Sequence, residues 1–264
     1  MQKLRTLSQV IFLLLLARLV LGLGQSDFEK WCPFGGIETL YLFFGYDTFS
    51  CSLGSSNLYM AAAVILLTLA ARRSFCGWVC PIGALSEWSA RLRAALLPRG
   101  AWAPPEKADF WLRKLKYPLV AVILFFTFAE RELIFRGFDP FYALCSKHGE
   151  DITYWSYVVL GGVLVGSFFV LVPFCRWFCP LAAVLNPFSR MGWLRLQRSE
   201  SSCIDCGICD KACPHGIPVS SRREVTDARC IQCFKCRSAC PRPGTLELGL
   251  PVFQPPTLKR EARD

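Results

Sequence analysis

Eight cysteines near the C-terminal end follow a regular spacing that suits metal ligation. Each of two runs reads C-x2-C-x2-C-x3-C-P. Three closely spaced cysteines let the backbone wrap one face of an iron-sulfur cubane and direct amide N–H groups at its sulfur atoms, while the fourth thiol crosses to the other cluster. We therefore expect two [4Fe-4S] clusters, one held by Cys203, Cys206, Cys209 and Cys240, the other by Cys230, Cys233, Cys236 and Cys213.

This doubled run resembles the bacterial two-cluster ferredoxins. The alternative is a pair of zinc knuckles, but zinc sites rarely use eight cysteines with a proline after each fourth ligand. The flanking residues predict a small α+β fold, with 217–219 and 245–248 as candidate strands.

A second cysteine pattern occurs twice in the apolar part of the chain, as FCGWVCP at 75–81 and FCRWFCP at 174–180. In a helical turn, two thiols four residues apart lie on one face. A pseudo-two-fold axis would bring the two pairs together, so a third cluster on four further ligands is expected: Cys76, Cys80, Cys175 and Cys179. The alternative is that these are buried packing residues beneath Trp78 and Trp177, which we expect to anchor helices at a membrane interface.

The apolar half also repeats outside these motifs. G-Y-D-T-F at 45–49 recurs as G-F-D-P-F at 137–141, and each copy continues through a Cys-Ser and an apolar run to the F-C-x-W-x-C-P motif. A duplicated unit, over about 38–86 and 130–185, explains this better than chance. Both copies are expected to run from outside to inside as parallel repeats.

The composition suggests a membrane protein, because 53% of the residues are apolar and 19% are charged. Four apolar segments, 7–23, 51–71, 116–135 and 154–174, predict transmembrane helices. The first could instead be a cleaved signal peptide, but it has no convincing cleavage site. The predicted fold class is an integral membrane all-α domain with four transmembrane helices in two parallel repeats, followed by the α+β ferredoxin domain.

Basic residues concentrate between the second and third predicted spans, which places that loop and both termini in the cytoplasm. The predicted location is the bacterial inner membrane, with the ferredoxin domain on the cytoplasmic side. The net charge of +10 thus has a topological explanation, and nucleic-acid binding is not expected. The predicted domains are 1–199 in the membrane, 200–250 as the ferredoxin, and a tail at 251–264.

Three cysteines fall outside the cluster motifs. Cys51 and Cys145 occupy near-equivalent repeat positions, so a disulfide between them is plausible, while Cys32 could contact a cofactor or metal. Each could equally be a small buried residue. His148 and His215 lie on opposite sides of the predicted membrane, which excludes a bis-histidine haem, and no C-x2-C-H is present for haem c.

Together, CPFGGIETLY at 32–41, the two F-C-x-W-x-C-P motifs and the terminal ferredoxin run resemble the NapH/NosR/MauN-type membrane polyferredoxins, nearest to the short NapH type. The resemblance implies electron transfer between the quinone pool and partner redox proteins, as a quinol dehydrogenase subunit of a larger complex. The alternative is a non-catalytic anchor and electron connector without its own quinone site. A metal-centre assembly or thiol-redox factor is a third interpretation, which labile clusters or a reactive Cys32 would indicate.

The quinone that the resemblance implies needs a proton acceptor when a quinol is oxidised, and the duplicated acids Glu38 and Glu130, with Asp47 and Asp139, are candidates. Turn, cap or solvated roles are the alternative for all four. Arg18, within the first predicted span, could pair with a quinone oxygen or an acid, or extend to the interface.

Overall fold

The computed structural model describes residues 1–21, 32–46, 54–97, 102, 104–130, 134–145 and 154–250. Asp47, Cys51 and His148 lie outside these ranges, as do the predicted tail and the side chain of Cys145. The disulfide predicted between Cys51 and Cys145 therefore stays a prediction.

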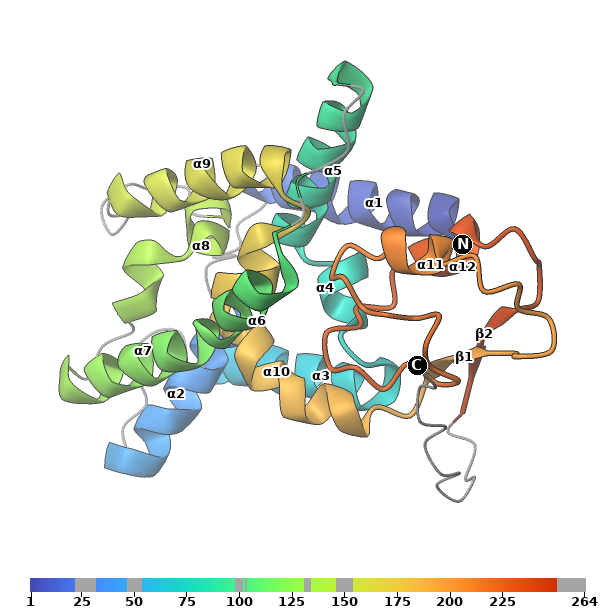
Figure 1. Cartoon of the computed structure of the whole chain (residues 1–264). Helices are drawn as coiled ribbons and strands as arrows, with labels where there is room; N and C mark the ends of the chain where they lie inside the picture. Colours follow the sequence, from blue (N-terminus) through green and yellow to red (C-terminus); the bar gives the residue numbers. More distant parts are fainter. Residues whose placement is uncertain are drawn as a thin grey trace.

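The described part of the chain is largely helical and ends in a small domain with two strands (Figure 1). Its first half contains α1 (Gln2–Val20), α2 (Pro33–Tyr46), α3 (Gly54–Ala71), α4 (Ser74–Trp78), α5 (Pro81–Leu96), α6 (Glu106–Lys114) and α7 (Lys116–Glu130). The second half contains the 3-10 helix η2 (Ile134–Phe138), α8 (Pro140–Cys145), α9 (Tyr154–Phe169), the π-helix η3 (Phe174–Phe178) and α10 (Pro180–Met191). The terminal domain contains β1 (Arg195–Arg198), α11 (Ile208–Lys211), α12 (Lys235–Ala239) and β2 (Leu246–Gly249).

The prediction of four transmembrane helices is wrong. Within the described ranges, no helix combines the length and the apolar composition needed to cross a membrane. The apolar runs are longer than the helices that they form: α7 ends at Glu130, and α9 ends at Phe169. After α9 the chain bends, with Val172 at φ 45° directly before Pro173. At 15 residues α7 extends about 22 Å, against about 30 Å of hydrocarbon.

Helix α1 illustrates why hydropathy misled the assignment. Gln2, Arg5 and Gln9 lie on one face, at helical spacing, and this face binds other parts of the protein. The Gln2 amide donates to the carbonyl oxygen of Cys233 (2.7 Å), and the Gln9 amide donates to that of Gly77 (3.1 Å). Figure 1 shows the N-terminus beside α12. The helix therefore packs its polar face against the cysteine-bearing elements.

The helical part is built around a core that contacts the cysteine motifs. Helix α2 packs on α3, and α10 packs on α3 and α7. Buried residues from these elements form one cluster, against which Cys32, Cys76, Cys80 and Cys179 pack: Phe34, Val64, Phe75, Ile123, Leu181 and Leu185. Gly36 permits the close approach of α2 and α3, because a Cβ there would lie 2.1 Å from the Asn57 carbonyl oxygen.

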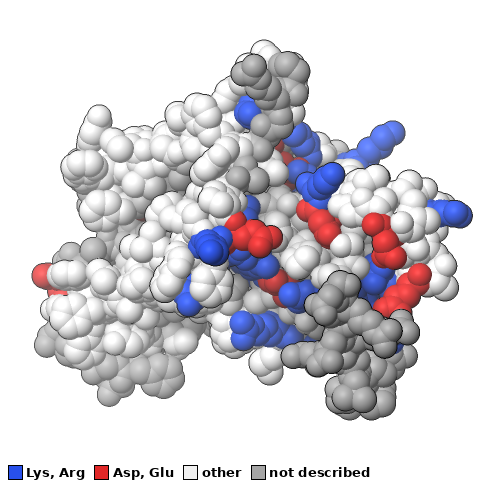
Figure 2. All heavy atoms as spheres, viewed as in Figure 1, with Lys and Arg blue, Asp and Glu red and all other residues white. Residues whose placement is uncertain are grey.

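The terminal domain has its own core beneath a two-stranded antiparallel sheet. β1 pairs with β2, with Leu196 opposite Leu248. The predicted strand at 245–248 is shifted by one residue from the observed β2, whereas 217–219 is not a strand: Ile217 and Val219 are buried core residues in irregular backbone. Pro218 between them has no N–H to donate to a strand ladder. Charged side chains gather over this domain, while the face over α7 and α9 shows few (Figure 2).

Candidate iron-sulfur sites

The C-terminal cysteines line two separate cavities. The first, which we call the outer ferredoxin cavity, is lined by Cys203, Cys206, Cys209 and Cys240. The second, the inner ferredoxin cavity, is lined by Cys213, Cys230, Cys233 and Cys236. The chain thus brings the fourth thiol of each run to the first three of the other run. These are the two sets that the spacing predicts as ligands, and cluster binding by each set stays a prediction.

The loops around the two cavities share an unusual backbone. Asp205 and Gly207 flank Cys206 with φ of 50° and 66°, and Gln232 and Phe234 flank Cys233 with φ of 46° and 54°. Left-handed conformations at non-glycine residues cost on the order of 1–3 kcal/mol each and persist only where the surroundings impose them. The repetition of this strained geometry in both C-x2-C-x2-C loops indicates a shared functional constraint on the loop shape.

The two C-x3-C pairs converge on a third cavity of about 50 Å³, the paired-motif cavity. Its lining contains the four predicted thiols, Cys76, Cys80, Cys175 and Cys179. The helical-turn prediction is correct only for the first cysteine of each pair, since Cys76 lies in α4 and Cys175 in η3. Duplicated motifs that are ninety-nine residues apart therefore meet at one site.

The second cysteine of each pair caps a helix. Cys80 (φ −60°, ψ 120°) precedes α5 and Cys179 (φ −62°, ψ 116°) precedes α10, each with a proline at the first helical position. Proline suits this position because its missing N–H would be unpaired there. Backbone N–H groups in the first turns of these helices oppose the rise in pKa that burial causes at the two thiols, although neither thiol accepts a capping hydrogen bond. Helix N-termini favour negative charge, so both caps are suited to thiolates.

Burial favours the protonated form of three paired-motif thiols, those of Cys80, Cys175 and Cys179. Burial, together with the neighbouring Cys76 thiol, raises the pKa of Cys80 to about 12 and that of Cys179 to about 11. Metal binding must therefore displace protons, and the energy comes from the metal–thiolate bonds. Every cysteine whose side chain the structure describes is a free thiol.

Cys32 and Asp139 also line the paired-motif cavity. The Cys32 Sγ donates to Asp139 Oδ2 (3.2 Å), and the Phe141 N–H donates to Asp139 Oδ1 (2.9 Å). Burial raises the pKa of Asp139 to about 6 and that of Cys32 well above its ordinary value. The cavity thus has a fifth thiol and a carboxyl group that lie 107 residues apart in sequence.

The predicted proton acceptors have unlike surroundings. Glu38 is buried and accepts a hydrogen bond from Thr127 Oγ1 (2.8 Å), and burial raises its pKa to about 7. Glu130, its repeat counterpart, is exposed at the end of α7. Arg18 is exposed on α1. Equivalent positions in the two repeats therefore have different environments.

A contact joins the paired-motif and inner ferredoxin cavities. The Trp78 Nε1 donates to the carbonyl oxygen of Gln232 (3.0 Å), and the Trp78 ring meets Phe234 edge to face, with centroids 6.3 Å apart. A Cβ at Gly77 would lie 2.6 Å from the Ile231 carbonyl oxygen. Ile231, Gln232 and Phe234 line the inner cavity. Trp78 therefore bridges two cysteine sites rather than anchoring a helix at an interface.

No motif in the sequence singled out Asp109. This buried residue of α6 accepts hydrogen bonds from Trp177 Nε1 (2.9 Å) and Arg176 Nη2 (2.6 Å), and it pairs with Arg113. It thus holds the residues that follow Cys175 in η3. Asp109 and Arg113 are four residues apart on an amphipathic segment, a spacing that predicts an ion pair on the solvated surface. Only the tertiary contact with η3 shows that Asp109 is buried.

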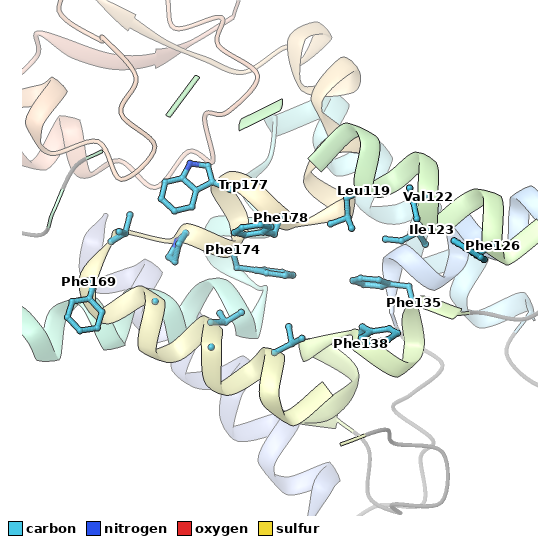
Figure 3. A pocket seen from close by; sticks show the side chains of 16 residues that line it. Leu119, Val122, Ile123, Phe126, Phe135, Phe138, Phe169, Phe174, Trp177 and Phe178 are labelled. Carbon is cyan, nitrogen blue, oxygen red and sulfur yellow. The ribbon is translucent and has the colours of Figure 1, made fainter. Parts of the chain in front are cut away.

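An apolar cavity of about 850 Å³ lies beside the paired-motif cavity, lined mainly by α7, α9 and η3 (Figure 3). Phe135 and Phe174 line both cavities. At Phe135 and Phe174, therefore, only the thickness of an aromatic side chain separates the two cavities.

Known protein families match the three cysteine-bearing segments. The "4Fe-4S binding domain" family matches residues 53–100 and 152–198, which are the two repeats, and the "4Fe-4S dicluster domain" family matches residues 195–241. One family thus matches both halves of the duplication. Among the described residues, no three His, Cys, Asp or Glu side chains form a site for a single metal ion.

Curated relatives extend the similarity over most of the chain. YccM of Escherichia coli is 29% identical over 75% of this chain and 56% of its own length. The uncharacterised protein MJ0750 of Methanocaldococcus jannaschii is 32% identical over 72% of this chain and 76% of its own. The ferredoxin-type protein NapH of Escherichia coli is 25% identical over 74% of this chain and 71% of its own. The chain belongs to the NapH/MauN-type polyferredoxin family.

As a polyferredoxin of this type, the chain is an iron-sulfur electron-transfer protein. The match spans a little over half of YccM, so activities of the longer relatives do not transfer directly. No solved structure is significantly similar to the chain. The residues present suit iron-sulfur clusters, because cysteine thiols and inward-directed backbone N–H groups surround the cavities.

Proposed function

We propose that this polyferredoxin exchanges electrons between a quinone and a partner redox protein, as a subunit of quinol dehydrogenase type. It would hold three [4Fe-4S] clusters, one in each thiol-lined cavity, with the ligand sets Cys76, Cys80, Cys175 and Cys179; Cys213, Cys230, Cys233 and Cys236; and Cys203, Cys206, Cys209 and Cys240. Bound clusters would accept and release electrons one at a time, which suits the conversion of a two-electron carrier into single electrons.

The observation that carries the proposal is the wall shared by the apolar and paired-motif cavities. A quinone ring with an isoprenoid tail is almost wholly apolar, and the large cavity is lined almost only by aliphatic and aromatic side chains. Because Phe135 and Phe174 line both spaces, a ring bound against them would lie within one side chain of the four thiols. Figure 3 shows the two side chains reaching into the cavity from η2 and η3.

The remaining cavities suggest an order for the path. Trp78 and Gly77 contact the lining of the inner ferredoxin cavity, so this cavity would follow the paired-motif cavity. Cys209 of the outer set and Cys213 and Cys230 of the inner set belong to or pack against one hydrophobic core. Cys206 in the outer cavity is exposed, which makes the outer cavity the place for exchange with a partner protein.

Protons released by a quinol need an acceptor near the shared wall. Glu38 is placed for this, because its carboxylate accepts a hydrogen bond from the backbone N–H of Phe135. A buried carboxyl group with a pKa of about 7 exchanges protons near neutral pH. Glu130 would have at most a secondary part, since it is exposed at the far end of α7.

The test fills the apolar cavity without touching a cysteine. Gly162 lines the cavity, whereas Gly161 does not, and a Cβ at either position meets no heavy atom within 4 Å. Each change replaces a glycine within helix α9 by leucine, so the two variants should have the same effect on the stability of that helix. In anaerobically prepared protein, Gly162→Leu is expected to slow the reduction of the clusters by a menaquinol analogue at least tenfold, while Gly161→Leu leaves the rate unchanged.

Reduction by dithionite provides the control, because it needs no quinol site and should be equal in all three proteins. If the quinol analogue does not reduce the clusters of the wild type, although a redox partner does, the chain is a connector without its own quinone site. Equal rates for the two leucine variants would show that quinol reacts elsewhere.

A further inference from the structure

Arg73 is a buried cation at the edge of the paired-motif cavity. It is 1% exposed and belongs to the cavity lining together with the four thiols. Its Nη1 lies 3.4 Å from the Asn186 amide oxygen, a long hydrogen bond, and its Nε and Nη2 atoms have no hydrogen-bond partner within the described part of the chain. A guanidinium group carries five N–H donors, so most of its donors are unused.

Two neighbouring arginines, unlike Arg73, each have a carboxylate partner. Arg176 pairs with Asp109 and Arg229 pairs with Asp227, both at 2.6 Å. Within the residues that the structure describes, Arg73 has no carboxylate within 4 Å, and the same holds for Lys116, which is 2% exposed. Burial of an unpaired charge costs several kcal/mol as an order of magnitude, so a site that keeps such a cation indicates an anion nearby.

Two features tie Arg73 to the thiols. Its side chain lines the same cavity as the thiols of Cys175 and Cys179. The duplication supplies a comparison: Arg73 lies two residues before FCGWVCP, and Val172 lies two residues before FCRWFCP. The repeat therefore forms its cysteine turn without an arginine, and a purely structural requirement does not explain Arg73.

We propose that Arg73 is the counter-charge of the cluster in the paired-motif cavity and holds its reduction potential high enough to accept electrons from quinol. The inference rests on the proposed third cluster. Four thiolates make this site strongly anionic, and reduction adds one further electron. A fixed cation stabilises the reduced form more than the oxidised form, because it interacts with the larger negative charge. Removal of the cation must therefore lower the potential.

The experiment compares Arg73→Gln with Arg73→Lys in anaerobic redox titrations followed by electron paramagnetic resonance. The signal of this cluster is identified as the one lost in Cys76→Ser. Arg73→Gln is expected to reduce the ratio of reduced to oxidised cluster at a given potential by about tenfold, which is a fall of about 59 mV for one electron. Arg73→Lys keeps the charge and should recover most of the shift. Arg190→Gln removes an exposed arginine on α10 and should change nothing.

The outcomes separate this inference from the proposed function. Wild-type protein with about eight rather than about twelve irons would remove the third cluster, and both proposals with it. Three clusters with an unchanged potential in Arg73→Gln would overturn only the role of Arg73. Loss of the third cluster in Arg73→Gln, with retention in Arg73→Lys, would support the need for the cation. Loss in both would overturn it, since the shape of arginine would then be the requirement.

Discussion

Glu87 joins three parts of the molecule, and its replacement by glutamine is the sharpest test of how the ferredoxin domain is held. The carboxylate of α5 pairs with Arg5 of α1, with Arg91 (2.8 Å) and with Lys235 of α12 (3.0 Å). Glu87 is 7% exposed and Arg5 is 1% exposed. Glu87→Gln keeps the shape of the side chain and removes the charge, so the buried Arg5 would be left without its counter-ion.

The size of the effect follows from the titration of Glu87. Desolvation alone would raise its pKa, but the charges of Lys235 and Arg5 outweigh it and lower the pKa from 4.5 to about 2. At 1.36 kcal/mol per pKa unit, the ionised carboxylate contributes about 3 kcal/mol. Because folding lowers the pKa of this acid, its stabilisation of the fold is fully present above pH 4.5 and is lost as the pH falls through about 2.

The measurement is native-state hydrogen exchange on anaerobic holoprotein at neutral pH, read in the backbone amides of α1 and α12. A loss of about 3 kcal/mol corresponds to roughly a hundredfold faster exchange through local opening. Glu200→Gln is the matched control, because it removes a carboxylate from the exposed pair with Arg223 in the same domain and should leave α1 and α12 unchanged. Unchanged exchange in Glu87→Gln would refute the view that this ion cluster docks the domain.

Two further changes test the contacts around the cysteine sites. Gly77→Ala places a Cβ 2.6 Å from the Ile231 carbonyl oxygen, so we expect the free energy of unfolding to fall by about 1–3 kcal/mol, measured by anaerobic thermal unfolding. The control Gly161→Ala has open space around its Cβ and should not destabilise the protein. Equal thermal midpoints for the two variants would show that the domains do not meet at Gly77. Burial raises the pKa of Glu38 from 4.5 to about 7, so its contribution to stability is present below pH 4.5 and is lost as the pH rises through about 7. Glu38→Gln should therefore be more stable than the wild type by up to about 3 kcal/mol at pH 8 but not at pH 5, and parallel pH profiles of the thermal midpoints would contradict this.

Cysteine spacing predicted most of the candidate site because the relevant geometry is local. Two residues between cysteines allow one loop to surround a cavity, and a proline directly after Cys80 or Cys179 begins a helix. These features depend on a few consecutive residues. The duplication likewise could be read from the sequence, and the same family matches both copies.

Hydropathy was a poorer guide, because it measures the composition of a run and not where a helix ends. The run after Tyr154 is apolar to Phe174, yet the positive φ of Val172 before Pro173 separates α9 from η3. In α1, the polar residues that hydropathy averages away make the contacts with α4 and with the loop that precedes α12.

By itself, the sequence indicated the chemistry of the sites: which thiols lie together, and that the chain is an iron-sulfur protein built on a repeat. Only the tertiary structure decided that Cys32, Asp139 and Arg73 share the paired-motif cavity, that Phe135 and Phe174 divide it from an apolar space, and that Trp78 reaches the ferredoxin domain. The reason is that spacing constrains neighbours within a few turns of backbone, whereas contacts across a hundred residues depend on how separate helices pack.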